Sequence, residues 1–152
     1  MGAGVAAVWT LLVLIPVDPF DDMLSVVVAG GPGTWFAVGY LSYLAVGVAG
    51  FASLAAVIES VELGEGKALN GGMMAAGLVL LAVGVNATCL LLGLAGAQGG
   101  YAETISHVSG ASLHSMLDPY VNVIRVTGGI AVVGAFASLA GIATARGQAR
   151  AG

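Results

Sequence analysis

Residues 69–97 read LNGGMMAAGLVLLAVGVNATCLLLGLAGA and contain no charged side chain. In the middle of this run, only Asn86 and Thr88 are strongly polar. A helix needs about 20 consecutive, mainly apolar residues to cross the hydrocarbon core of a bilayer. The run exceeds that length, and it therefore predicts a transmembrane helix, which we expect the glycine pair Gly99 and Gly100 to end.

Further apolar runs lie on both sides of this one. Residues 34–58 and 121–144 are long enough to cross, whereas residues 4–17 have a length at which a tilted or re-entrant segment competes with a full crossing. No Lys or Arg precedes the first run and no clear cleavage site follows it, so we expect a retained helix and not a signal peptide. The sequence predicts an all-α fold, a polytopic integral membrane protein with one domain over residues 1–152 and a bundle of four transmembrane helices.

Composition supports this class and excludes others. Hydrophobic residues make up 59% of the chain and charged residues 8%, whereas a soluble domain carries about 25% charged residues. The net charge of −4, without a basic patch, argues against nucleic-acid binding. Cys89 is the only cysteine, which excludes an intrachain disulfide and paired-cysteine metal or redox sites. The expected partners are the lipid bilayer and other membrane subunits.

The positive charges predict the topology. Lys67 follows the second predicted span, and Arg146 and Arg150 follow the fourth, so two crossings separate these sites. They are therefore expected on one side of the membrane, which the positive-inside rule assigns to the cytoplasm together with both chain termini. The connecting segments 18–22 and 101–120 would face outward, and we expect the protein in the plasma membrane.

Small residues spaced four apart are the candidate helix-packing positions, because such spacing lets helix backbones approach closely. The pairs are Gly72 and Ala76, Gly93 and Ala97, Gly134 and Ser138, and Ala137 and Gly141. Packing within the chain and packing against other subunits both satisfy this pattern. Asn86 is expected to add an interhelical hydrogen bond, worth about 0.6–2 kcal/mol.

Both histidines lie between the third and fourth predicted spans. If this segment is one helix, its 100° rotation per residue brings Glu103, His107, His114 and Asp118 onto one side. We expect Pro119 to kink or end that helix. The result would be an amphipathic interfacial segment, with its apolar side on lipid or on the helices.

Three interpretations of this polar side remain open. It can simply face water, it can contact a partner subunit, or it can form a quinone, proton or cofactor site with His107, His114 and Asp118 as its residues. Arg125 lies about one turn inside the last predicted span. We expect it to act as an interfacial charge, extending toward water or pairing with Asp118 or with the segment 18–22.

A cofactor held by this chain alone is not expected. His107 and His114 would lie about 10 Å apart along a helix, so they cannot both bind one iron. Haem or quinone would therefore need residues from a partner. Zinc prefers three or four protein ligands, which one straight helix rarely supplies. No nucleophile–base–acid arrangement is evident, so we expect no catalysis by the chain on its own.

The sequence predicts a non-catalytic accessory or structural subunit of a larger membrane complex. Fold-level analogy favours a respiratory or other energy-transducing complex. A small homo-oligomeric transporter or channel is the alternative, although intramembrane ionisable groups usually mark transport pathways and these spans contain few. A further alternative is a quinone- or haem-contacting subunit that uses the His107/His114 segment.

Overall fold

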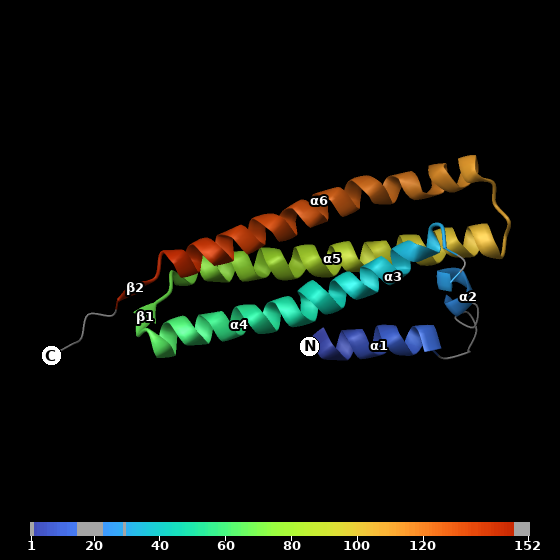
Figure 1. Ribbon diagram of the computed structural model, residues 1–152. Coiled ribbons are helices and arrows are strands. Elements are labelled where there is room, and N and C mark those ends of the chain that lie inside the picture. Colours follow the sequence, from blue (N-terminus) through green and yellow to red (C-terminus); the bar gives the residue numbers. More distant parts are fainter. Residues whose placement is uncertain (1, 15–22, 29, 148–152) are drawn as a thin grey trace.

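The computed structural model describes residues 2–14, 23–28 and 30–147, and these residues are nearly all helical. Two short helices come first, followed by three long helical rods and two short strands that pair at one end (Figure 1). The elements are α1 (Gly2–Leu14), α2 (Met23–Val28), α3 (Gly33–Ser42), η1 (Tyr43–Gly50), α4 (Phe51–Glu59), η2 (Ser60–Gly64), β1 (Lys67–Ala68), α5 (Gly71–Thr104), α6 (Gly110–Ala143) and β2 (Arg146–Gly147).

Three helical rods are long and apolar enough to cross a membrane. They are Gly33–Gly64, which combines α3, η1, α4 and η2, and the single helices α5 and α6. The first helix, α1, has 13 residues, which correspond to about 20 Å. This is shorter than the hydrocarbon core of about 30 Å. The sequence predicted four spans, whereas the described residues contain three candidate spans and the shorter α1. Residues 15–17 of the first predicted span lie outside the described part.

The long rods form an open layer with α5 in the middle. Helix α5 packs against α6 on one side and against α3 on the other, and α3 and α6 make no comparable contact with each other in the described chain. Figure 1 shows α1 beside the α3–α4 rod, starting partway along it. The described helices thus confirm a helical protein with three candidate spans, and they do not confirm the bundle of four transmembrane helices that the sequence predicted.

Small residues allow α5 and α6 to pack closely, and one of the predicted pairs of small residues lies in this contact. A Cβ atom added at Gly84 would lie 2.6 Å from the Ala131 Cα, and one added at Gly77 would lie 2.5 Å from the Ser138 backbone nitrogen. Gly134 and Ser138 are buried in this contact, and the Ser138 hydroxyl donates to the Gly134 carbonyl over 2.9 Å. The structure places both residues of this predicted pair in the contact between α5 and α6.

The pair Gly72 and Ala76 behaves differently. Both residues are exposed. A Cβ atom added at Gly72 would meet only the Asn70 side chain, 3.8 Å away. Among the described residues this pair does not pack against another helix.

The boundaries around residues 97–120 differ from the sequence prediction. Helix α5 does not end at the glycine pair 99–100 but continues to Thr104. These glycines serve close packing, because a Cβ atom at Gly99 would lie 2.7 Å from the Pro32 Cβ and one at Gly100 would lie 2.9 Å from the Gly33 Cα. The two glycines, which predicted the end of a helix, instead allow α5 to approach the start of the first rod closely.

Helix α6 begins at Gly110 and passes through Pro119 without ending. The predicted separate interfacial segment is therefore wrong, because its first residues finish α5, its last residues start α6, and a turn joins them. Pro119 is exposed. Proline has no N–H to donate to the carbonyl one turn earlier in the helix. That carbonyl is left free near the helix surface, where water can bond to it if the site lies outside a hydrocarbon core.

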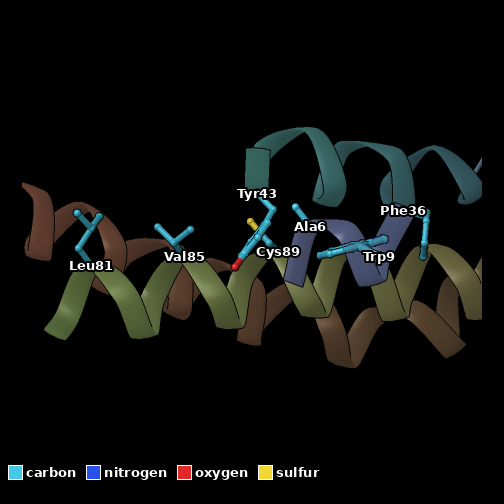
Figure 2. Packing of buried hydrophobic residues seen from close by; sticks show 7 residues of the cluster. All are labelled: Ala6, Trp9, Phe36, Tyr43, Leu81, Val85 and Cys89. Carbon is cyan, nitrogen blue, oxygen red and sulfur yellow. The ribbon is translucent and has the colours of Figure 1, made fainter. Parts of the chain in front are cut away.

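Aromatic side chains dock α1 onto the layer. Trp9 is buried and meets Phe36 edge-on, with ring centroids 5.6 Å apart. The Thr10 and Tyr40 hydroxyl oxygens lie 2.7 Å apart and share a hydrogen bond. Figure 2 shows Trp9 with Ala6, Phe36, Tyr43 and Cys89 in the buried cluster that continues along α5 to Val85 and Leu81. Aromatic contacts of this kind add about 0.5–1.5 kcal/mol beyond burial, so α1 is a packed part of the fold.

The two short strands place positive charges together. Strands β1 and β2 pair antiparallel, with Lys67 opposite Gly147 and Ala68 opposite Arg146. Lys67 and Arg146 thus lie at the same end of the molecule, as predicted from the two intervening spans. Arg150 lies outside the described residues.

Candidate functional site

The charged residues divide α6 into two parts. Helices α5 and α6 have 34 residues each, which is about 51 Å of helix and exceeds the hydrocarbon core of about 30 Å. Residues 126–143 of α6 carry no charge and measure about 27 Å. A hydrocarbon core placed on this interval has Arg125 at one boundary, and the outer parts of α5 and α6 extend beyond it as a helical hairpin.

A groove runs along the layer between α3 and α6, with α5 as its floor. Three hollows follow one another along it. Their lining residues include Trp35, Val38, Ser42 and Val46 on the first rod, and Val121, Arg125, Gly128 and Val132 on α6. Steps of three and four residues keep these positions on one face of each helix. The hollows therefore belong to one groove, which we call the α3–α6 groove.

The outer hollow has a volume of about 250 Å³ and a polar rim. Its apolar walls come from Pro32 and Trp35 on one side and Leu117 on the other, and His114 and Asp118 form the rim. Both rim residues are exposed. The His114 Nδ1 lies 3.1 Å from the Gly110 carbonyl oxygen, where a protonated Nδ1 donates a hydrogen bond.

The predicted contact between His114 and Asp118 is not formed among the described residues. His114 instead approaches its own helix one turn toward the N-terminus, the direction in which helical side chains lean. Asp118 has neither a hydrogen bond nor an ion pair with any described residue. Its carboxylate is thus available at the rim of the outer hollow.

His107 and Glu103 do not join His114 and Asp118 on one helix face. His107 lies in the turn between α5 and α6, with a backbone φ of 53°, and is exposed. Glu103 lies on the last turn of α5, and its carboxylate lies against Gly31 in the turn that precedes α3. The predicted single stripe is wrong, because the turn at residues 105–109 interrupts the helical periodicity on which it depended.

The middle hollow, of about 420 Å³, contains Arg125. Trp35, Val38, Leu92 and Ile124 supply its apolar lining. Arg125 is exposed and forms no hydrogen bond or ion pair within the described chain. The predicted pairing with Asp118 is therefore not formed, and the other predicted partner, segment 18–22, lies outside the described residues.

The inner hollow, of about 280 Å³, is almost entirely apolar. Val46 and Val85 line it together with Cys89, Ala131 and Ala135. The nearby Thr88 hydroxyl donates to the Thr127 oxygen over 2.9 Å, and Thr127 donates to the Val123 carbonyl over 3.0 Å. These hydroxyl protons are already used, so the inner hollow suits hydrocarbon and not a polar solute.

The interhelical hydrogen bond comes from Thr88 and not from Asn86. The Asn86 Nδ2 donates to the Ala82 carbonyl of its own helix over 2.8 Å. The sequence showed Thr88 one turn from Gly84, but the role of Thr127 required knowing how α5 and α6 are aligned. A second link between them, from the Tyr120 hydroxyl to the Gln98 oxygen over 2.7 Å, was likewise not predicted.

The polar chemistry of the described groove comes mainly from His114, Asp118 and Arg125. Within the described ranges, no three His, Cys, Asp or Glu side chains come together to hold a metal ion. His114 is the single imidazole that lines the described groove, so haem ligation from two sides would need a partner chain. Among the described residues, the groove combines a cation and a carboxylate that are not paired with each other, together with an apolar channel.

In comparisons with known proteins, no protein-family model, no curated protein and no solved structure matches the chain.

Proposed function

We propose that the chain is a non-catalytic accessory subunit that packs laterally against other subunits of a larger membrane complex. One observation carries this proposal. Helix α4 lies within an apolar candidate span, yet none of its residues is buried in the described chain. In the most apolar window of its rod, 6% of the residues are buried, against 33% for α5.

The contacts of the first rod explain this exposure. The rod meets α5 through α3 and η1, whereas α4 has no comparable contact with α5 or α6 among the described elements. Helices associate in membranes mainly through van der Waals packing and hydrogen bonds. The apolar α4, together with the exposed pair Gly72 and Ala76 on the neighbouring α5, offers a surface for a helix of another subunit.

The alternatives receive less support from the geometry. A transport pathway needs polar side chains that are free to line it. Asn86, Thr88 and Thr127 are instead bonded to their own helix or to each other. A haem-contacting role rests on His114 without a second ligand. The accessory role in a respiratory or other energy-transducing complex, at the plasma membrane with cytoplasmic termini, thus remains our proposal.

Site-specific photocrosslinking in native membranes tests the subunit role. A photoreactive residue at Val57 on α4, which is 46% exposed, should give a protein adduct of defined mass. The same probe at Phe136 on α6, which is 69% exposed, serves as the control and is expected to give lipid adducts. If Val57 yields lipid adducts alone and the mildly extracted chain carries no other subunit in native mass spectrometry, the proposal is wrong. If Val57 gives a protein adduct and native mass spectrometry shows a copurifying subunit, the mass of the adduct identifies the partner.

A further inference from the structure

We propose that the α3–α6 groove binds one phospholipid whose head group carries a phosphate and a primary amine. In this arrangement the phosphate lies on Arg125, the amine lies toward Asp118, and an acyl chain lies in the inner hollow. The inference concerns a groove formed within one chain, so it goes beyond the subunit role and does not depend on it.

Arg125 is the basis of the phosphate site. It is exposed in the middle hollow, at the boundary of the uncharged interval of α6, and has no partner in the described part of the chain. A guanidinium group presents several N–H donors in a planar fork that matches a phosphate. A charge at this depth needs an anionic partner or water, and lipid phosphates lie at this level.

The direction of α6 favours the same contact. Its N-terminus, Gly110, lies at the outer end of the helix, away from the uncharged interval. Helical side chains lean toward the N-terminus of their helix. The long side chain of Arg125 therefore extends away from the hydrocarbon and toward the head-group layer, as arginines at membrane boundaries do.

Asp118 supplies the complementary charge for the amine. It lies seven residues before Arg125 on the same helix face, about 10 Å further out along the axis, and the Arg125 side chain leans in its direction. Its carboxylate is exposed and unpaired among the described residues. In a zwitterionic head group the positive amine lies further from the hydrocarbon than the phosphate, as Asp118 lies further out than Arg125. A purely anionic head group would instead meet the Asp118 carboxylate.

The inner hollow accommodates the acyl chain. From Arg125 to Ala135 the groove follows α6 for about 15 Å. Val46, Val85 and Ala131 line this stretch, and the Thr88 and Thr127 hydroxyl protons are bonded within the protein. An acyl chain lying here continues directly from a phosphate on Arg125, because the hollows share one helix face.

Native mass spectrometry of the full chain in detergent, with added phosphatidylethanolamine or phosphatidylglycerol, tests the head-group site. We expect one bound phosphatidylethanolamine in preference to phosphatidylglycerol. Arg125→Gln should weaken this binding about tenfold, as expected for a lost charge-assisted hydrogen bond. Arg146→Gln, which removes an exposed cation at the other end of α6, should leave it unchanged. Asp118→Asn should remove the preference between the two lipids.

A second pair of variants tests the acyl site independently. Gly128 lines the inner hollow, and a Cβ atom added there meets only the Thr88 Oγ1, 3.9 Å away. Gly129 has open space around it. Gly128→Leu should therefore fill the groove and reduce lipid binding, whereas Gly129→Leu should not. The proposal fails if Arg125→Gln binds lipid like the parent chain, if both lipids bind equally to the parent chain, if the two leucine variants behave alike, or if a second copy of the chain occupies the groove.

Discussion

Replacing Gly134 by alanine tests how α5 and α6 are held together. A Cβ atom at this position would lie 2.7 Å from the Leu81 Cα and 2.8 Å from the Gly77 carbonyl oxygen. Both are backbone atoms of α5, so no side-chain rotation can relieve the contact and the two helices must separate locally. Overpacking of this kind destabilises by about 1–3 kcal/mol, and separation also weakens the Thr88–Thr127 hydrogen bond.

Gly129→Ala provides the matched control. It lies on the same helix, and a Cβ atom there has nothing within 4 Å. Replacing glycine by alanine inside a helix stabilises by about 0.5–1 kcal/mol when the space is free. The two variants should therefore change the free energy of unfolding in opposite directions.

The assay is reversible unfolding of the full chain in mixed micelles, followed by tryptophan fluorescence and helical circular dichroism. A Gly134→Ala protein that is as stable as the Gly129→Ala protein would refute the close packing of α5 and α6. A gain for both variants would instead show that helix propensity in micelles, and not interhelical distance, determines the result.

Three further predictions concern other parts of the fold. Trp9→Ala should weaken the docking of α1 by about 3–5 kcal/mol, so hydrogen exchange should become faster in α1 while α5 stays protected; unchanged exchange in α1 would contradict the aromatic docking. Thr127→Val should lower the free energy of unfolding by about 0.6–1.7 kcal/mol, because it removes the interhelical hydrogen bond. Asn86→Leu should change this free energy less, since the Asn86 side chain bonds within its own helix. A larger loss for Asn86→Leu than for Thr127→Val in the unfolding assay would show the assignment wrong. Single cysteines at positions 67 and 107, in a chain without the native cysteine, should react with an impermeant reagent from opposite sides of the membrane, and labelling from one side would exclude the three-rod arrangement.

The sequence predicted helices well and their ends poorly. Long, mainly apolar runs identified all three rods, because a bilayer imposes the same length requirement on any crossing helix. Gly99 and Gly100 misled the prediction of the end of α5, since glycine both breaks helices and permits close packing. Only the approach of Pro32 and Gly33, which are distant in the sequence, distinguishes the two roles.

The candidate site was predicted in part, for a related reason. His114, Asp118 and Arg125 were singled out as polar residues in an apolar chain, and all three line the α3–α6 groove. His107 was grouped with them because one helix was assumed to extend across the turn at residues 105–109. The apolar half of the groove gave no sequence signal, since residues such as Val46 and Ala135 are indistinguishable from lipid-facing residues until α3 and α6 are placed on either side of α5.

The continuity of α6 through Pro119 is what creates the groove's charge order. A helix that ended at Pro119 would let the residues before it rotate independently of those after it. Because α6 continues, Asp118 and Arg125 keep a seven-residue separation, which is close to two full turns, and they face the same side. The outer carboxylate, the cation at the hydrocarbon boundary and the apolar channel then follow one another along a single rigid element, whose position α5 fixes through Gly84 and Thr88. Pro119, which the sequence analysis expected to kink or end the helix, therefore leaves α6 continuous and the alignment of the two charges intact.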